Sequence, residues 1–241
     1  MRHNVRGKLL RVLLVLLLVV VVMTVFLQKT RDLTGFRGFR RLRDTEPSRS
    51  IKTSSQDGPC IMKKDCPKDS FSFFIRSGAA NVMPPKICLR NKLVLGVVLN
   101  NAGPGINIVL INGATGDVLK TRHFDMYGGD VKPLLEFLTS IENGSVALMA
   151  SYDDPSTKLT KEARQLISEL GSSSVNSLGF RDNWVFVGGK GAPVQSGLQS
   201  GLEKVLKNDN SKNKYDKWPE LVEIQGCIPR YLGGGEEETR N

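Results

Sequence analysis

The chain has 241 residues, of which 40% are hydrophobic, and its formal net charge is +10. A charge of this size is typical of nucleic-acid-binding proteins, but residues 1–57 hold 12 Lys or Arg against 4 Asp or Glu, which leaves 22 basic and 20 acidic residues for 58–241. The folded part therefore lacks the basic excess that a phosphate backbone requires, and no nucleic-acid partner is expected.

A basic amino terminus is followed by Val12–Leu27, a run of 16 residues without a charge. The apolar region of a cleaved signal peptide has about 7 to 15 residues, whereas a membrane-spanning helix needs about 20. The run lies between these lengths, so two interpretations of residues 1–28 stay open: a cleaved signal peptide or a type II signal-anchor. In both cases this segment is the part of the chain that meets a membrane.

Residues 29–57 are polar and rich in Arg, Ser and Thr, with few apolar side chains. A segment of this composition does not bury a core, so we expect a disordered basic stem or linker. From about residue 58 to residue 230 regular apolar segments predict one domain of ordinary size. The glycine- and glutamate-rich end, 231–241, is expected to be a disordered tail.

All four cysteines, Cys60, Cys66, Cys88 and Cys227, follow the apolar run. A targeting segment together with an even number of cysteines indicates an oxidising lumen or the outside of the cell, where disulfides persist. Four cysteines permit three pairings, and the sequence pattern alone does not choose among them.

Six short segments rich in β-branched and aromatic residues are predicted to be strands. Residues Asn112–Gly116 tolerate positive φ, so the third and fourth of these segments are expected to form a hairpin. The segments are Phe71–Ile75, Leu93–Leu99, Ile106–Ile111, Val118–Phe124, Val146–Ala150 and Trp184–Val187.

Three helices are predicted from apolar residues that recur on one face. Val131–Ile141 follows Asp130, which can cap the first turn, and Thr160–Leu170 begins with a capping Thr and precedes Gly171. A weaker pattern predicts a third helix over Leu198–Leu206. Strands interleaved with helices indicate an α/β or α+β sandwich.

Asn143-Gly144-Ser145 is the single acceptor sequence for N-glycosylation. It falls where a predicted helix ends and a strand begins. Either Asn143 is glycosylated, or the tripeptide is an unmodified turn at the helix end.

Several strings, taken in chain order, resemble the ILEI/PANDER family of secreted cytokine-like proteins. Among them are Ser77-Gly78-Ala79-Ala80-Asn81-Val82, Phe124-Asp125-Met126-Tyr127-Gly128-Gly129-Asp130-Val131, Gly179-Phe180-Arg181-Asp182-Asn183-Trp184-Val185-Phe186 and Glu223-Ile224-Gln225-Gly226-Cys227-Ile228-Pro229. The resemblance extends over most of residues 58–230. It implies a β-β-α sandwich of two twisted antiparallel sheets flanked by helices, and a relation to a GG-type lectin-like module in the stem of a protein O-mannose glycosyltransferase.

The resemblance also implies particular residue roles. It pairs Cys60 with Cys88 and Cys66 with Cys227. Some family members carry a further cysteine that allows covalent dimers, but its place here is taken by Val187, so a disulfide-linked dimer is not expected.

By resemblance to the stem module, carbohydrate contacts fall on Arg122, Asp153 and Arg181. Each choice has a plainer alternative: Arg122 as a solvated strand residue and Arg181 as the internal ion-pair partner of Asp182. Trp184, three positions after Arg181, has the plainer alternative of a ring in the core.

Material for catalysis is sparse. His3 lies in the targeting segment, so a zinc cluster or a Ser-His-Asp triad would depend on His123 alone, and no metal or cofactor is expected. Asp153 and Asp154 are adjacent, which favours a turn or a binding role over paired acid–base work.

We therefore expect a secreted, non-enzymatic, cytokine-like protein that passes through the ER and Golgi and whose partner is a cell-surface receptor or a glycan. The alternative is a Golgi-resident type II membrane lectin that keeps its amino-terminal anchor.

Overall fold

The computed structural model describes residues 16–24, 60, 65–191, 202–213 and 217–230. The chain divides into two units, Met1–Thr53 and Ser54–Asn241. In the first unit residues 16–24 are helical with exposed side chains. Within the described residues, no helix has both the length and the apolar character that a membrane crossing requires. The predicted stem, the predicted tail and most of the predicted targeting segment lie outside the described residues.

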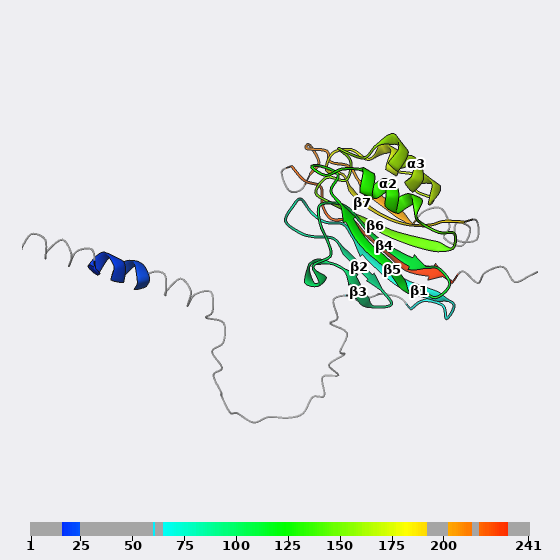
Figure 1. The fold of residues 1–241 in the computed structure, drawn as a ribbon, viewed down its shortest axis with the longest axis horizontal. Coiled ribbons are helices and arrows are strands. Elements are labelled where there is room, and N and C mark those ends of the chain that lie inside the picture. The colour runs from blue at the N-terminus through cyan, green and yellow to red at the C-terminus, as the bar shows by residue number, and fades with distance from the viewer. Residues whose placement is uncertain (1–15, 25–59, 61–64, 192–201, 214–216, 231–241) are drawn as a thin grey trace, which may run out of the picture. The chain divides into compact units, whose positions relative to one another are not determined.

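The described part of the second unit contains two sheets and two α-helices (Figure 1). One sheet has the strand order β3-β2-β1-β9 and the other the order β5-β4-β6-β7-β8, and every pairing described between neighbours is antiparallel. The predicted fold class, two antiparallel sheets with flanking helices, is confirmed. In chain order the elements are β1 (Ser70–Arg76), β2 (Lys86–Leu89), β3 (Lys92–Leu95), η1 (Val97–Leu99), β4 (Gly105–Asn112), β5 (Val118–Phe124), α2 (Lys132–Thr139), β6 (Ser145–Tyr152), α3 (Lys161–Glu169), η2 (Val175–Ser177), β7 (Asn183–Gly189), β8 (Glu203–Leu206) and β9 (Glu223–Pro229).

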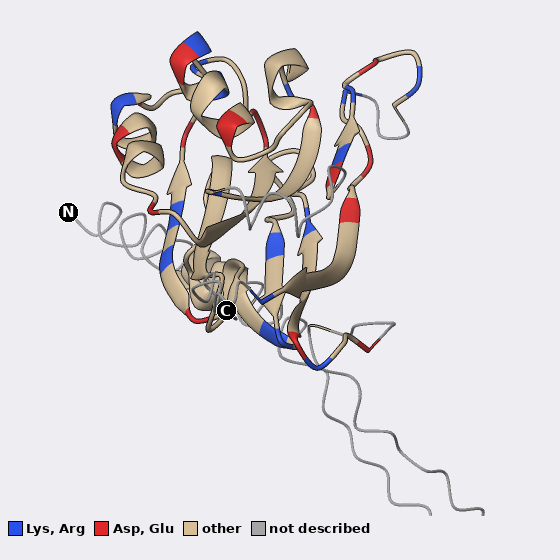
Figure 2. Cartoon of the chain, turned by 90° about the vertical axis from the view of Figure 1, so that its right-hand side faces the viewer, with Lys and Arg blue, Asp and Glu red and all other residues tan. Residues whose placement is uncertain are grey.

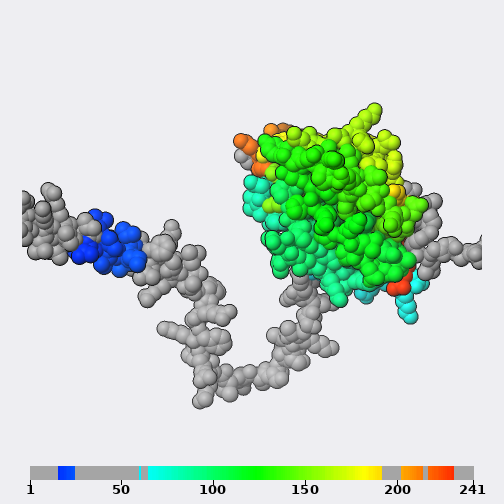
Figure 3. Space-filling model, viewed as in Figure 1, coloured from blue at the N-terminus to red at the C-terminus, as the bar shows by residue number. Residues whose placement is uncertain are grey.

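The five-stranded sheet is the middle layer of the domain. One cluster of buried apolar side chains lies between the two sheets, and another joins the five-stranded sheet to α2 and α3. Strands β4, β6 and β7 are consequently buried on both faces and read as continuous apolar runs. In Figure 3 the green and yellow-green middle of the chain forms most of the visible face of this domain.

The helices predicted over Val131–Ile141 and Thr160–Leu170 are confirmed, with slightly shorter bounds. The Asp130 carboxylate accepts a hydrogen bond from the backbone N–H of Lys132, at 3.0 Å, where α2 begins. The Thr160 hydroxyl accepts one from the N–H of Ala163, at 3.3 Å, which caps α3. These side chains satisfy N–H groups that have no partner inside the helix.

The predicted hairpin is also confirmed, because β4 pairs with β5 in antiparallel register. The side-chain oxygen of Asn112 accepts hydrogen bonds from the N–H groups of Ala114 and Thr115, at 2.8 and 3.0 Å. Gly116 closes the turn with a φ of 74°, which a glycine adopts without a steric penalty.

Two sequence-based predictions require correction. The prediction of a third helix is wrong for residues 203–206, which form strand β8 and pair with β7. Residues 198–201 of that prediction lie outside the described residues. The strand predicted over Leu93–Leu99 ends at Leu95, because the side-chain amide of Asn101 bonds to Gly96 and Val94 and turns the chain into η1. Strands β2 and β9 were not among the six predicted segments.

Both disulfides attach the start of the domain to the four-stranded sheet. Cys60 is joined to Cys88 on β2, and Cys66 to Cys227 on β9. This is the pairing that the family resemblance implies, and it leaves no cysteine free.

Charges of both signs are interspersed over the domain (Figure 2). In that view Lys and Arg positions occur on several strands, helices and loops, as do Asp and Glu positions. This distribution agrees with the small excess of basic residues in the folded part of the sequence.

Candidate functional site

Asp153 and Arg181 belong to a group of three loops at one end of the five-stranded sheet. The first loop follows β5, the second follows β6, and the third precedes β7. Backbone hydrogen bonds join them: the N–H of Lys158 donates to the carbonyl of Met126 at 2.6 Å, and the N–H of Arg181 donates to the carboxylate of Asp154 at 3.4 Å. The three loops therefore form one connected surface.

Asp154 is one of two buried carboxylates that hold these loops in place. It is 1% exposed and accepts hydrogen bonds from both the N–H and the hydroxyl of Ser156, from the N–H of Thr157, and from the N–H of Arg181. A carboxylate with this many donors has little capacity left for a ligand. Asp154 thus acts as a positioning residue for the loops after β6 and before β7.

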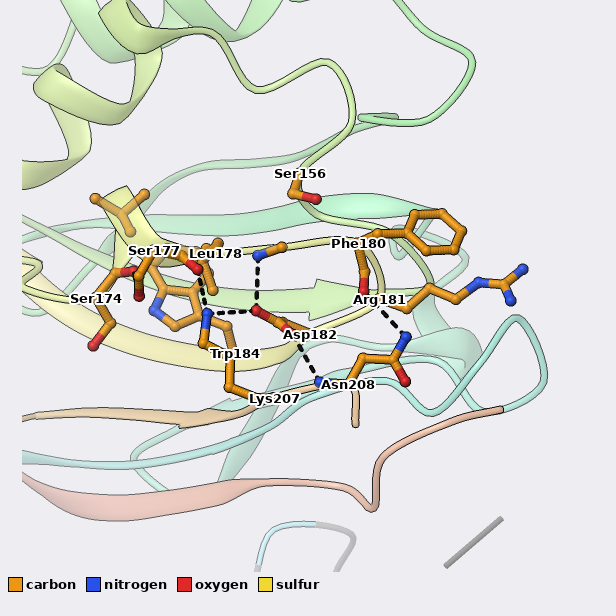
Figure 4. Close-up of polar contacts among 12 residues, drawn as sticks. Ser156, Ser174, Ser177, Leu178, Phe180, Arg181, Asp182, Trp184, Lys207 and Asn208 are labelled. Carbon is orange, nitrogen blue, oxygen red and sulfur yellow. Dashed lines mark hydrogen bonds and ion pairs between the residues drawn. The ribbon is translucent and has the colours of Figure 1, made fainter. Parts of the chain in front are cut away.

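Asp182 is the second buried carboxylate, at 3% exposure. It accepts from the N–H of Gly179 at 2.7 Å, from the ammonium group of Lys207 at 2.8 Å and from the N–H of Asn208 at 2.8 Å. Figure 4 shows Asp182 at the centre of these contacts, while the side chains of Phe180 and Arg181 point away from it. The alternative in which Arg181 pairs with Asp182 is therefore wrong, because Lys207 holds that carboxylate.

Arg181 pairs instead with Asp153. Its Nε lies 3.7 Å from Oδ1 of Asp153, and the two side chains are 29% and 24% exposed. This distance is too long for a hydrogen bond, and the buried Nε has no other hydrogen-bond partner. The pair thus combines opposite charges with one buried donor, the Nε–H of Arg181, that has no acceptor.

Electrostatics and backbone geometry set this pair apart. Burial raises the pKa of the Asp153 carboxyl, the nearby Arg181 guanidinium lowers it, and the charges of Asp154 and Asp125 raise it further, so that the net pKa is above its ordinary value. Asp153 and Arg181 also have φ angles of 60° and 61°, in the left-handed region that residues with a side chain seldom adopt. Backbone strain of this kind is concentrated at functional sites.

Aromatic rings surround the guanidinium of Arg181. Its central carbon lies 3.7 Å from the ring centroid of Trp218 and 4.6 Å from that of Phe180. The ring of Tyr127 lies 6.3 Å from that of Phe180, and these two side chains are 61% and 46% exposed. The surface therefore offers accessible apolar rings beside a charged pair.

Arg122, the third residue named by the resemblance, lies apart from the pair. It is exposed on the edge strand β5, where it is the register partner of Ile108, and its guanidinium donates to the carbonyl of Thr121 at 3.3 Å. Within the described residues, no hydrogen bond or ion pair joins it to Asp153 or Arg181.

Trp184 is a core residue. It is fully buried, stacks on Phe186, and donates its ring N–H to the carboxylate of Glu203 at 2.7 Å. The ring next to Arg181 is Trp218, which the sequence analysis did not identify. It lies in an irregular segment 37 positions after Arg181. The only sequence feature that could have indicated a role there is that it is a large aromatic residue between strands.

A cavity of about 480 Å³ lies beside the loops that hold Asp182. It is lined by Leu206, Lys207, Asp209, Lys212, Asn213, Pro219 and Glu220. Lys207 is shared with the Asp182 cluster, and Pro219 follows Trp218 in the chain. The cavity therefore lies at the same end of the domain as the candidate site.

The structure also describes the predicted glycosylation residue and the metal-ligating side chains. Asn143 is exposed in the turn between α2 and β6. No group of three or more metal-ligating side chains that could hold a metal ion occurs among the residues that the structure describes.

Comparison with known proteins gives consistent matches. Residues 104–192 match the family model described as interleukin-like EMT inducer, a span that contains Asp153 and Arg181 but not Trp218. The protein FAM3C of Rattus norvegicus is 56% identical over 171 residues, which cover 71% of this chain and 74% of the relative. The protein FAM3C of Homo sapiens is 53% identical over the same coverage, and the human protein FAM3A is 45% identical over 197 residues, covering 80% of this chain and 84% of the relative.

Proposed function

The chain belongs to the interleukin-like EMT inducer (ILEI) family, and we propose that it is a secreted, cytokine-like protein that acts by binding, with Asp153, Arg181 and Trp218 forming a carbohydrate-binding site. Its partner in this proposal is a glycan, free or carried by a cell-surface receptor. The observation that carries the proposal is the surface pair of Arg181 and Asp153, held against aromatic rings.

The chemistry of this pair suits a sugar. Neighbouring hydroxyl groups of a pyranose donate to a carboxylate and accept from a guanidinium, and such charge-assisted hydrogen bonds are stronger than those between neutral groups. The C–H face of the sugar packs on an exposed ring, for which Phe180 and Tyr127 are available. Small-molecule sites commonly combine apolar lining with a few well-placed polar groups.

The carboxylates at this end favour binding over hydrolysis. Glycoside hydrolysis in most families uses two carboxyl groups that flank the scissile bond. Asp154 is buried and committed to backbone and side-chain donors, so it is not available as a second catalytic carboxyl group beside Asp153. This supports a non-enzymatic role.

The disulfides support a domain that lies in the lumen of the secretory pathway or outside the cell. Both bridges join distant parts of the domain, and such bonds persist in oxidising compartments. A secreted ligand is recovered from the medium of expressing cells, whereas the alternative, a Golgi-resident lectin, is retained in membranes with residues 1–28 attached.

The test is a glycan array probed with protein from the medium, followed by titration of the strongest ligand. We expect Asp153→Asn and Arg181→Gln each to weaken binding by about tenfold or more, since each removes hydrogen bonds to a charged group. Trp218→Ala should weaken it through loss of the ring that supports Arg181. Lys161→Gln, an exposed substitution on α3, is the matched control and should leave affinity unchanged.

A second readout is the pH dependence of affinity. Because the pKa of Asp153 is raised, its carboxylate becomes protonated at a higher pH than an exposed Asp does. As the pH is lowered, binding that needs the carboxylate should therefore weaken at a higher pH than the one at which an exposed Asp becomes protonated. Absence of any glycan bound above background, or full affinity in Asp153→Asn, would contradict the proposal.

A further inference from the structure

Three ionisable residues form a row across one end of the four-stranded sheet. Arg76 at the end of β1 is the register partner of Lys86 on β2 and also of Glu223 on β9. Their chain neighbours Ile75 and Ile87 are fully buried between the sheets. Because side chains alternate along a strand, Arg76 and Lys86 extend from the opposite, outer face of the sheet.

The two cations of this row have no ion-pair partner among the described residues. Like charges directly opposite each other on neighbouring strands are destabilising. Within the described residues neither Arg76 nor Lys86 is among the side chains that form ion pairs, even though Glu223 is the other register partner of Arg76. The Nε–H of Arg76 is buried and has no hydrogen-bond acceptor. A buried donor without an acceptor is a rare and unfavourable arrangement.

The surroundings of Lys86 point the same way. Its pKa is lowered by burial and by the positive charge of Arg76, and the charge of Glu223 offsets this only in part. Its ammonium group lies 5.9 Å from the ring centroid of Phe74, the outward-facing residue two positions before Arg76 on β1. An anion placed between the two cations would relieve their repulsion.

We propose that Arg76 and Lys86 form a binding site for a tetrahedral oxyanion, the sulfate or phosphate group of an extracellular ligand. A guanidinium presents parallel N–H donors that match two oxygens of such a group, and a lysine ammonium supplies a third contact. The site is independent of the proposed carbohydrate site, since it lies on the other sheet and shares no residue with it. Two sources carry this chemistry: a free inorganic ion and a sulfate ester of an acidic polysaccharide.

The buried Nε–H of Arg76 provides a site-specific probe. In the full protein recovered from the medium and labelled with ¹⁵N, its resonance is followed while sodium sulfate replaces sodium chloride at constant ionic strength. We expect a saturable shift of this resonance and of the backbone amide of Lys86. A shift that stays linear to the highest sulfate concentration would overturn the proposal.

Variants separate the site from general charge effects. Lys86→Gln should weaken sulfate binding by about tenfold, as expected for the loss of one charge-assisted contact, while Lys86→Arg should retain it. Glu223→Gln should tighten binding several-fold, because it removes the one nearby negative charge of the row. The double variant Lys92→Gln with Lys161→Gln removes two exposed positive charges elsewhere and should bind as the unmodified protein does.

A heparin-derived hexasaccharide distinguishes the two sources. If it binds more tightly than inorganic sulfate at equal sulfate concentration, and Lys86→Gln weakens both, the site takes a polysaccharide sulfate; equal affinities indicate a free ion. Equal binding of both probes to Lys86→Gln and to the unmodified protein would overturn the site.

Discussion

Asn143 is the residue whose modification the structure makes easiest to test. Its side chain is exposed in the turn that precedes β6, where Gly144 has a φ of 84°. We propose that Asn143 carries an N-linked glycan, which requires an accessible surface loop in a secreted chain. Treatment of the secreted protein with glycosidase should lower its mass, and Asn143→Gln should abolish the difference.

The matched control for this test is Asn176→Gln, because Asn176 is also exposed but lies outside any acceptor sequence. It should keep the mass difference. An unmodified protein whose mass does not change with glycosidase would favour the alternative, a bare turn at the helix end.

The charged members of the candidate site were accessible from the sequence, but its aromatic member was not. Asp153 and Arg181 were named through a family resemblance, and the structure places them 3.7 Å apart. Trp184, three positions after Arg181, faces the core because it lies on a strand that is covered on both sides. Trp218 meets Arg181 only through the fold, since the irregular segment that carries it has no periodic pattern to indicate its direction.

At the scale of elements, the edge strand β8 depends on one carboxylate. Glu203 accepts hydrogen bonds from the hydroxyl of Ser172, from the N–H of Ser173 and from the ring N–H of Trp184. Burial disfavours the charge of Glu203, but these hydrogen bonds outweigh it and lower its pKa. The carboxylate therefore attaches β8 to the loop after α3.

We expect Glu203→Gln to lower the free energy of unfolding at pH 7 by about 1–3 kcal/mol, the usual cost of disrupting hydrogen bonds to a charged group. Because the folded-state pKa of Glu203 is depressed, its contribution is complete above the unfolded value near 4.5 and is lost as the pH falls through the lower folded value. Urea denaturation at pH 7 and at pH 3 measures this. The difference between the two proteins should shrink at the lower pH.

The control for Glu203→Gln is Glu142→Gln, an exposed substitution that should change stability by less than about 0.5 kcal/mol. A loss that is the same at both pH values would show that packing of the side chain, and not its charge, holds β8 in place.

The elements that sequence patterns predicted poorly are those that tertiary contacts define. Leu198, Leu202 and Leu206 have the spacing of a helix face, yet residues 203–206 pair with β7 because the edge of that strand provides hydrogen-bond partners. Strand β9 joins β1 along seven register pairs and contains Cys227, so its position is set by a long-range pairing. Segments with local apolar periodicity, such as α2, α3 and the β4–β5 hairpin, were predicted correctly.

At the scale of the whole molecule, the two disulfides differ in the length of chain that they close. Cys60 and Cys88 are 28 positions apart, whereas Cys66 and Cys227 are 161 apart. On the chain-entropy model these bridges stabilise the folded state by at most about 3.5 and about 5 kcal/mol. We expect the Ala double variant of the longer loop to lose more stability in urea denaturation than that of the shorter one.

Packing adds to the stability loss of the shorter-loop variant and so reduces the expected difference between the two variants. Cys60 and Cys88 are 3% and 1% exposed, and their replacement by Ala also leaves a small cavity. Hydrogen exchange separates the two effects by location. Without the Cys66–Cys227 bridge, β9 is held by its pairing with β1 and a few contacts with β8, so its amides should lose protection before those of β1 and β2. Without the Cys60–Cys88 bridge, β9 should keep its protection. Equal loss of protection across β1, β2 and β9 in both variants would mean that the four-stranded sheet opens as one unit, whichever bridge is removed.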